Sequence, residues 1–346
     1  ALYRTGLPFD TDQLALVDPE IVNKTLDQAK TANIISLEST QLETAKDSFA
    51  NFARQARLNL KAPGTVSTIG ELLHQAKLDP TERDDFEKLY FTPRKEGKTF
   101  WQEVEEAQII SDAQKLDSLK LQGKLAYLTL NSAELTNDLQ TEIGSLDQLP
   151  TLIDKRFHKP QTWVERIQSL ASGDNTKLNQ LIPPDYIGDT TEDRLQAYAE
   201  DKARQVSISF PTQLVQHMLS TNKELTVIAP KEADEARLKQ IKESVISFLK
   251  AAAPLGYEIG RIPLDPFVDK NRTDLKKKLK LTESEQDKAE FETILNAVRQ
   301  CHCLYQLTPT DNALEQLILA KFTSAHDIVA YTRLHFLDRV KATKLT

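Results

Sequence analysis

Glycine is scarce in this chain, with 10 residues in 346 against roughly 7% in an average protein. The tight turns of β-hairpins need backbone positions with positive φ, which glycine adopts most readily. A chain with so few glycines is poorly suited to a sheet of connected hairpins. The sequence therefore predicts an all-α fold, an irregular multi-helix array of helical hairpins.

Two long segments repeat apolar residues at three- and four-residue intervals, which is the period of one helix face. In LETAKDSFANFARQARLNL, residues 42–60, the repeat consists of Ala45, Phe49, Phe52, Ala53 and Ala56. In EFETILNAVRQCHCLY, residues 290–305, it consists of Phe291, Ile294, Leu295, Val298 and Tyr305. We expect two amphipathic helices with these side chains buried. One strand-like run, LTVIA at 225–229, is short, and we interpret it as a connector.

Several helix starts are predicted where an oxygen-bearing side chain precedes proline. Asp or Thr can cap the helix by accepting its first N–H groups, and proline fits the first helical position because its missing N–H has no partner there. The pairs are Asp18–Pro19, Asp79–Pro80, Asp265–Pro266 and Thr308–Pro309. The sequence TIGE, residues 68–71, has the spacing of a capping box and predicts a further start.

The clearest break in the helical pattern is NQLIPPDYIGDTTEDR, residues 179–194. Pro183 and Pro184 cannot continue a helix, and Gly188 allows a bend before Thr191 caps the next one.

We place a domain junction at this break and expect an N-terminal helical domain, residues 1–182, and a C-terminal helical domain, residues 190–346. No strict repeat period emerges, so a regular solenoid is not supported. In ISFPTQLVQHML, residues 208–219, Pro211 predicts a helix restart that buries Phe210 and Leu214.

Charge argues against a nucleic-acid partner. The formal net charge is -7 and the isoelectric point is near 5.6, so the chain lacks a basic field that would neutralise phosphates. Residues 9–35 could form a DNA-reading helix-turn-helix, but Lys24 and Lys30 are offset there by Glu20 and Asp27. We interpret this segment as an antiparallel helical hairpin.

The sequence gives no sign of membrane insertion by this segment, because it contains no run of about 18 apolar residues. Its start, ALYRTGLPFD, lacks the pattern of a secretion signal. A start at alanine fits either a piece of a larger polypeptide or removal of a methionine. Two cysteines are too few for a disulfide framework, so folding does not depend on an oxidising compartment.

Both cysteines lie in QCHCLYQLTPT, residues 300–310, near the end of a predicted helix that stops before Pro309. Two residues on a helix correspond to about 200° around its axis, so the sulfurs of Cys301 and Cys303 point apart. A structural zinc needs about four ligands, and the other histidines, at 74, 158, 217, 326 and 335, are scattered singly. We predict no metal site, and expect a cysteine and a histidine to pack beside Val298 in the core.

No catalytic or cofactor-binding residue emerges from the other motifs. EGKT, residues 96–99, imitates the end of a phosphate-binding loop, but the required first glycine and leading strand are missing, so we expect a turn. The pairs Asp84–Asp85 and Glu105–Glu106 are adjacent, and helix neighbours do not share a face, so they are interpreted as solvated surface. Neither GxSxG nor HExxH occurs. The sequence therefore does not predict an enzyme.

Several stretches together resemble the helical region of the A component of bacterial Tc insecticidal toxin complexes, the neuraminidase-like or ABC toxin N-terminal region. The order in which they follow one another is more specific than any single motif. They are FEKLYFTPRKEGKTFWQEV (86–104), LDSLKLQGKLAYLTLNSAELTNDL (116–139), TWVERIQ (162–168), IPPDYIGDTTEDRLQAYAEDKARQVSISFPT (182–212) and LYQLTPTDNALEQLILAKFTSAHDIV (304–329).

The resemblance implies a non-catalytic, shell-like and extended structural module of a secreted pore-forming translocation assembly, without cofactors. Its partners would be other modules of the same larger polypeptide and other A-component chains in a homo-oligomer. Secretion from a bacterium would proceed without a visible signal peptide. No sialidase chemistry is implied, because the S-x-D-x-G-x-T-W boxes of sialidases are missing from the sequence. The alternative is an independent helical adaptor that binds another protein through a groove.

Overall fold

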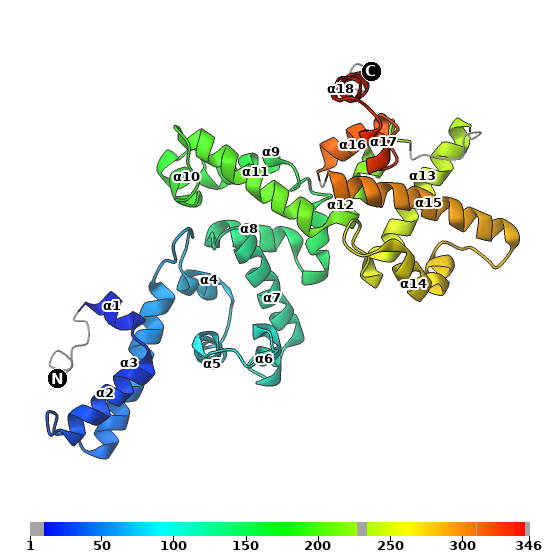
Figure 1. Cartoon of the computed structure of the whole chain (residues 1–346). Helices are drawn as coiled ribbons and strands as arrows, with labels where there is room; N and C mark the ends of the chain where they lie inside the picture. Colours follow the sequence, from blue (N-terminus) through cyan, green and yellow to red (C-terminus); the bar gives the residue numbers. More distant parts are fainter. Residues whose placement is uncertain (1–9, 227–233, 309, 343–346) are drawn as a thin grey trace. The chain divides into compact units, whose positions relative to one another are not determined.

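The computed structural model describes residues 10–226, 234–308 and 310–342. All regular secondary structure in these ranges is helical, which confirms the predicted all-α fold (Figure 1). The chain divides into two compact units, Ala1–Leu149 with Glu165–Tyr198, and Pro150–Val164 with Ala199–Thr346.

The helices of the first half of the chain are α1 (Thr11–Leu16), α2 (Pro19–Thr31), α3 (Ser39–Asn59), α4 (Ile69–Gln75), α5 (Pro80–Phe91), α6 (Phe100–Glu106), α7 (Ala113–Leu128), α8 (Ala133–Ile143), the 3-10 helix η2 (Leu146–Leu152), α9 (Pro160–Ala171) and α10 (Asn175–Leu181). Those that follow are α11 (Thr191–Ser209), α12 (Pro211–Thr221), α13 (Glu235–Ala252), the 3-10 helix η3 (Ala253–Leu255), α14 (Leu264–Lys278), α15 (Glu285–Leu307), α16 (Asp311–Leu319), α17 (Ala325–Val329) and α18 (Arg333–Ala342).

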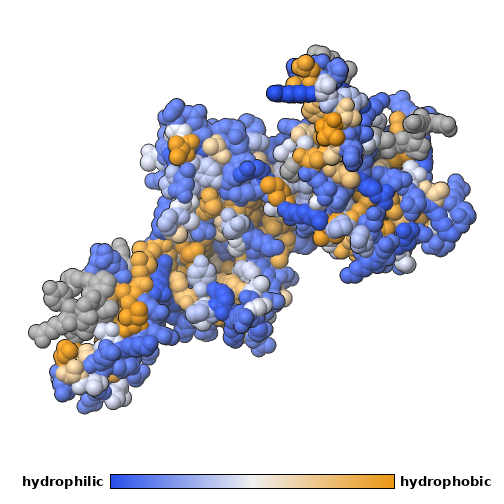
Figure 2. All heavy atoms as spheres, in the orientation of Figure 1, coloured by the Kyte–Doolittle hydropathy of each residue, from blue (hydrophilic) through white to orange (hydrophobic). Residues whose placement is uncertain are grey.

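In the first unit, α2 packs along α3 as a hairpin (Figure 1). Its core contains Val22 and Leu26 from α2 and Phe49 and Ala53 from α3, so two of the five predicted positions of α3 are buried. Phe52 lies at the surface with 39% of its area exposed. The remaining two predicted positions are half-buried, Ala45 and Ala56. Figure 2 shows hydrophobic side chains gathered at the surface in the region of α3.

A second cluster of the same unit is built by α3 to α7. Leu58, Leu73, Phe86, Val104 and Leu119 are buried together, one from each helix. The cluster thus holds together five helices that are consecutive in the chain.

The second unit is organised around α15, which packs against α13, α14 and α16. The five apolar residues predicted to face the core of this helix are all buried, as the sequence pattern indicates. Its N-cap is Ser284, whose hydroxyl accepts the Asp287 N–H, and the helix ends at Leu307, before position 309 as predicted.

Two of the predicted Asp–Pro helix starts are confirmed. α2 and α5 begin at Pro19 and Pro80, and the carboxylates of Asp18 and Asp79 accept backbone N–H groups of the first turn. The capping box predicted at residues 68–71 is present at the start of α4.

The helix start predicted at Asp265 is wrong by two positions. α14 begins at Leu264, after Pro263, so Asp265 lies in the first turn and does not cap the helix. The first four N–H groups of a helix have no partner inside it. Proline, which lacks an N–H, is therefore tolerated throughout the first turn, and Pro266 occupies such a position. The Asp–Pro pattern therefore locates a helix start only approximately.

The start predicted at Thr308–Pro309 lies partly outside the described residues, because Pro309 is not among them. Thr308 terminates α15 as its C-cap, and Thr310 is the residue that precedes α16. Likewise, Leu225 and Thr226 of the predicted connector have no regular structure, and its remaining residues lie outside the described ranges.

The break at Pro183 and Pro184 lies between α10 and α11, inside the first unit. The cap of α11 is Thr190 and not Thr191, because the Asp193 N–H donates to the Thr190 hydroxyl and the Thr190 N–H donates to the Asp193 carboxylate. Gly188 is required here, since a Cβ at this position would lie 2.8 Å from the backbone nitrogen of Arg194. The units divide within α9 and α11, and the domain junction at residues 183–189 stays a prediction.

The helix restart at Pro211 is confirmed, but the predicted burial of Phe210 is not. α11 ends at Ser209 and α12 begins at Pro211, with Leu214 buried and Phe210 only half-buried between the helices. Because Phe210 is the N-cap and not a helical residue, its side chain does not follow the helix period that aligns Leu214 with the core.

The structure also bears on the EGKT segment and on the search for a membrane-spanning helix. The EGKT segment forms a turn, and Thr99 at its end caps α6, as the sequence indicates. Within the described ranges, no helix combines the length and the apolar composition needed to cross a bilayer.

Candidate functional site

The Cys301–His302–Cys303 motif belongs to the core of the second unit. Cys301 and His302 are buried in α15, as predicted, whereas Cys303 is half-buried. Burial raises the pKa of the Cys301 thiol to about 12, so this sulfur stays protonated and unreactive. Among the described residues, no three His, Cys, Asp or Glu side chains are arranged to hold a metal ion.

His302 on α15 contacts the loop before α14 through its Nδ1 atom. The Gly260 N–H donates to this nitrogen at 3.1 Å and the Tyr257 hydroxyl lies 2.9 Å from it. Nδ1 is therefore the acceptor of a neutral imidazole. Burial lowers the pKa of His302, which favours the same neutral form. The histidine thus serves the packing of the loop before α14 against α15.

Gly260 makes this contact possible. Its φ is +78°, and a Cβ would lie 2.5 Å from the ring of Tyr305 on α15. The buried Thr212 hydroxyl extends the network by donating to the Tyr257 carbonyl at 2.9 Å and accepting the Ile259 N–H at 3.0 Å. Sequence analysis missed this network because its members are far apart in the chain.

The second unit also contains a polar cavity of about 160 Å³. His158 and Lys159, just before α9, line it together with residues of α12 and α16. The rings of His158 and His217 meet edge to face, with centroids 5.2 Å apart. His217 Nδ1 lies 3.2 Å from an Asp154 carboxylate oxygen. His158 and His217, which are far apart in the sequence, are therefore neighbours in the lining of this cavity.

Acidic residues of α16 form the opposite wall of this cavity. Asp311 pairs with Lys159, and its carboxylate lies 3.6 Å from His158 Nε2. Glu315 accepts a hydrogen bond from the side-chain amide of Asn222. Burial raises the pKa of Glu315, and the nearby Asp311 carboxylate acts in the same direction.

His158 is neutral in this setting, because burial lowers its pKa to about 4 although the Asp311 charge opposes the shift. Its side chain is only 3% exposed. The cavity can therefore offer a neutral imidazole and two carboxylates to a bound group. The sequence carried no signal for it, since the lining residues come from three separate segments.

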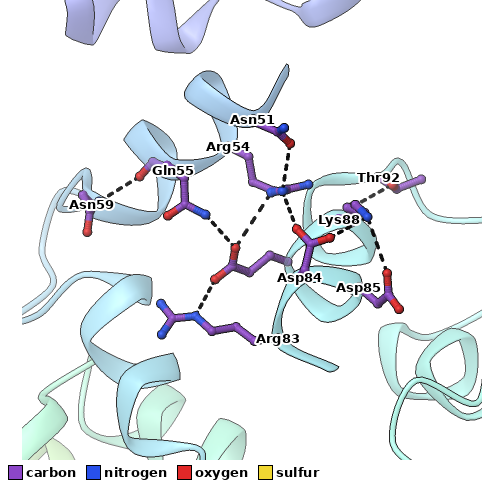
Figure 3. Close-up of polar contacts among 10 residues, drawn as sticks. Asn51, Arg54, Gln55, Asn59, Arg83, Asp84, Asp85, Lys88 and Thr92 are labelled. Atoms are coloured by element: carbon purple, nitrogen blue, oxygen red, sulfur yellow. Dashed lines mark hydrogen bonds and ion pairs between the residues drawn. The ribbon is translucent and has the colours of Figure 1, made fainter. Parts of the chain in front are cut away.

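A third polar cluster connects α3 and α5 in the first unit (Figure 3). The Glu87 carboxylate is buried and accepts hydrogen bonds from Arg83 Nε at 2.8 Å and Gln55 Nε2 at 2.9 Å. Arg54 lies beside it, with its Nε atom 3.8 Å from Glu87, and donates to Asp84 at 2.5 Å. These contacts across two helices make the cluster a structural clamp.

The carboxylate pairs predicted to be surface residues are at the surface. Asp84 and Asp85 are about half exposed, and Lys88 contacts both, at 2.6 Å and 3.6 Å. Glu105 and Glu106 are also accessible and form ion pairs with Lys120 and Lys98. Sequence analysis missed the buried Glu87, although its spacing of four from Arg83 is a recognisable helix pair.

A groove of about 610 Å³ adjoins the clamp. Apolar side chains including Leu16 and Phe91 line it beside the cations of Arg54, Arg57 and Lys88. Arg57 donates to the Val17 carbonyl at 2.9 Å, which holds the groove wall to the chain between α1 and α2.

Comparisons of the chain with protein-family models, with curated proteins and with solved structures found no match. No relative therefore assigns a role to the cavity, the clamp or the groove.

Proposed function

We propose that this chain is a non-catalytic structural module in the shell of a Tc-toxin-like A component, the function that its resemblance to that family implies. In this role the module contacts other parts of the same polypeptide and neighbouring A-component chains. The resemblance rests on the order of five sequence stretches, and the all-α fold agrees with it.

The observation that best supports a contact role is the exposed apolar surface of α17 and α18. Val329 and Leu334 are 76% and 73% exposed, and Tyr331 and Leu337 are also accessible. Figure 2 shows hydrophobic side chains in the region of these two helices. Apolar side chains grouped in this way are typical of surfaces that bind another protein. α18 also carries more basic than acidic residues, which suits an acidic partner surface.

The proposal is tested first by the gene sequence on both sides of this segment. Channel-forming helices and β-rich modules downstream support the shell role, whereas a stop codon directly after residue 346 contradicts it. In the parent polypeptide, Val329→Asp with Leu334→Asp should weaken assembly measured by mass photometry. Tyr127→Asp, at an exposed aromatic residue of the first unit, is the matched control and should assemble normally.

The groove beside α3 favours a second candidate, an independent helical adaptor. Its lining combines apolar side chains and the carboxylates of Asp18 and Glu20 with three cations, those of Arg54, Arg57 and Lys88. The excess of positive charge suits a partner helix with apolar and acidic side chains. Selection of peptides that bind the whole chain tests this role. Acidic amphipathic peptides should be enriched, and their binding should be lost in Lys88→Glu but kept in Lys250→Glu.

A further inference from the structure

The cavity in the second unit contains a hydrogen-bond acceptor without a donor. A neutral imidazole has one N–H and one lone pair. In His158, Nδ1 is buried without a hydrogen-bond partner, and Nε2 is 3.6 Å from Asp311, beyond hydrogen-bond distance. Whichever nitrogen carries the proton, no described residue donates to the other one. An unsatisfied polar group this deeply buried indicates a missing partner.

Glu315 supplies a second acceptor with spare capacity. Its carboxylate forms no ion pair with any described residue, and a neutral amide, that of Asn222, donates to it. A carboxylate has about four lone-pair positions, so most of them are left for another donor. Burial raises the pKa of Glu315 although the Lys159 charge opposes the shift, and a bound cation would favour the ionised form further.

The positive side chains at the cavity do not fill this role. The Lys159 ammonium is directed to Asp311 and to Asn312, whose side-chain oxygen lies 3.2 Å away. Arg156 lines the cavity but is an exposed residue. The acceptors of His158 and Glu315 therefore remain available to a ligand in the cavity.

The rest of the lining favours an organic ligand over a metal ion. Leu214 and Met218 are buried side chains that contribute an apolar surface to the same cavity. Its volume of about 160 Å³ is similar to that of an engineered cavity of about 150 Å³ that admits benzene. No metal-binding group of three His, Cys, Asp or Glu occurs in the described ranges.

We propose that this cavity binds a small organic ammonium ion, whose NH₃⁺ group donates to Glu315, Asp311 and His158 while its alkyl part contacts Leu214 and Met218. An ammonium group has three N–H donors and no acceptor, so it complements a wall of acceptors. Hydrogen bonds between an ammonium and a carboxylate are charge-assisted and stronger than neutral ones. The site is independent of the proposed shell function.

The test titrates the whole chain with propylammonium chloride and follows the histidine ring signals by NMR. The His158 signal should shift saturably, and the dissociation constant should rise about tenfold or more in Glu315→Gln and in Asp311→Asn. Glu258→Gln, on the exposed surface of the same unit, is the matched control and should bind like the original chain. Circular dichroism verifies that each variant is folded.

Two further ligands complete the test. Tetramethylammonium chloride has the charge but no N–H donor, and it should produce no saturable shift. A capped lysine peptide that binds more tightly than propylammonium identifies a protein lysine as the source of the ammonium, and weaker binding identifies a free amine. Equal effects of propylammonium and sodium chloride, or unchanged affinity in Glu315→Gln, would refute the site.

Discussion

At the scale of single residues, two buried histidines show how the same side chain takes different roles. His302 accepts the Gly260 N–H and is satisfied within the core. His158 is equally buried but faces a cavity without such a donor. The difference lies in the surrounding backbone, since Gly260 brings an N–H to the His302 ring and no residue in the described ranges brings one to His158. Burial alone therefore does not distinguish a packing histidine from a binding one.

The buried histidine in the cavity predicts a pH dependence of stability. An unfolded histidine has a pKa near 6.5, whereas that of His158 is lowered to about 4. Between these values the unfolded chain binds a proton that the folded chain does not. The free energy of unfolding should thus fall as the pH drops from about 6.5 to about 4, by up to about 3 kcal/mol.

Urea unfolding at a series of pH values measures this slope. His158→Gln should flatten it, and His335→Gln, at an exposed position of α18, should leave it unchanged. His302 has a lowered pKa as well and contributes a remaining part of the slope. An identical slope in His158→Gln and the original chain would show that His158 is protonated to the same extent in both states.

The clamp between α3 and α5 predicts a large difference between two neighbouring carboxylates. Glu87→Ala removes a buried carboxylate and leaves Arg83 and Gln55 without their acceptor, which should cost about 3 kcal/mol of unfolding free energy. Asp85→Ala removes a half-exposed partner of Lys88 and should cost less than about 1 kcal/mol. Chemical denaturation compares the two variants, and similar losses would mean that the cluster does not stabilise the unit.

At the scale of helices, the Asp–Pro pattern predicts different effects for two similar residues. Asp18 caps α2 and accepts the Glu20 N–H at 2.9 Å, so Asp18→Ala should cost about 1 kcal/mol. Asp265 lies inside the first turn of α14 with its side chain exposed, and its ion pair with Arg299 is at the surface. Asp265→Ala should therefore cost less than about 0.5 kcal/mol. Hydrogen exchange in each helix measures the effect locally, and a larger effect at Asp265 would contradict the assigned helix start.

The helices themselves were predictable because their signals are local. Caps, prolines and the helical period act within one turn, and they identified α2, α4, α5 and α15 correctly. Phe52 was wrongly expected in the core, because the period says which face is apolar but not how much of it a neighbouring helix covers. Phe210 was wrongly expected there because, as the N-cap of α12, it lies outside the helix period.

The cavity could not be predicted for a related reason. It needs residues from three segments that meet only in the folded chain, and single histidines carry no spacing signal.

At the scale of the whole molecule, the two compact units are discontinuous in the sequence. Pro150–Val164 belongs to the second unit although Glu165–Tyr198, which follows it, belongs to the first. Within that short segment, Ile153, Phe157 and Trp163 are buried, and the Trp163 indole N–H donates to the Phe157 carbonyl at 2.7 Å. Dividing the chain at the predicted junction, residues 183–189, would separate these side chains from the rest of the second unit.

Two fragments distinguish the sequence-based junction from the observed units. Residues 190–346 match the predicted C-terminal domain but lack the segment with His158 and Trp163, whereas residues 150–346 retain it. Loss of one buried Phe or Trp side chain costs about 3 to 5 kcal/mol, which is a large share of the stability of a typical domain. The shorter fragment should therefore unfold at a clearly lower urea concentration, or without cooperativity, and bind a dye specific for exposed apolar surface. Equal midpoints for both fragments would instead favour the junction at residues 183–189, because they would mean that the second half folds without Pro150–Val164.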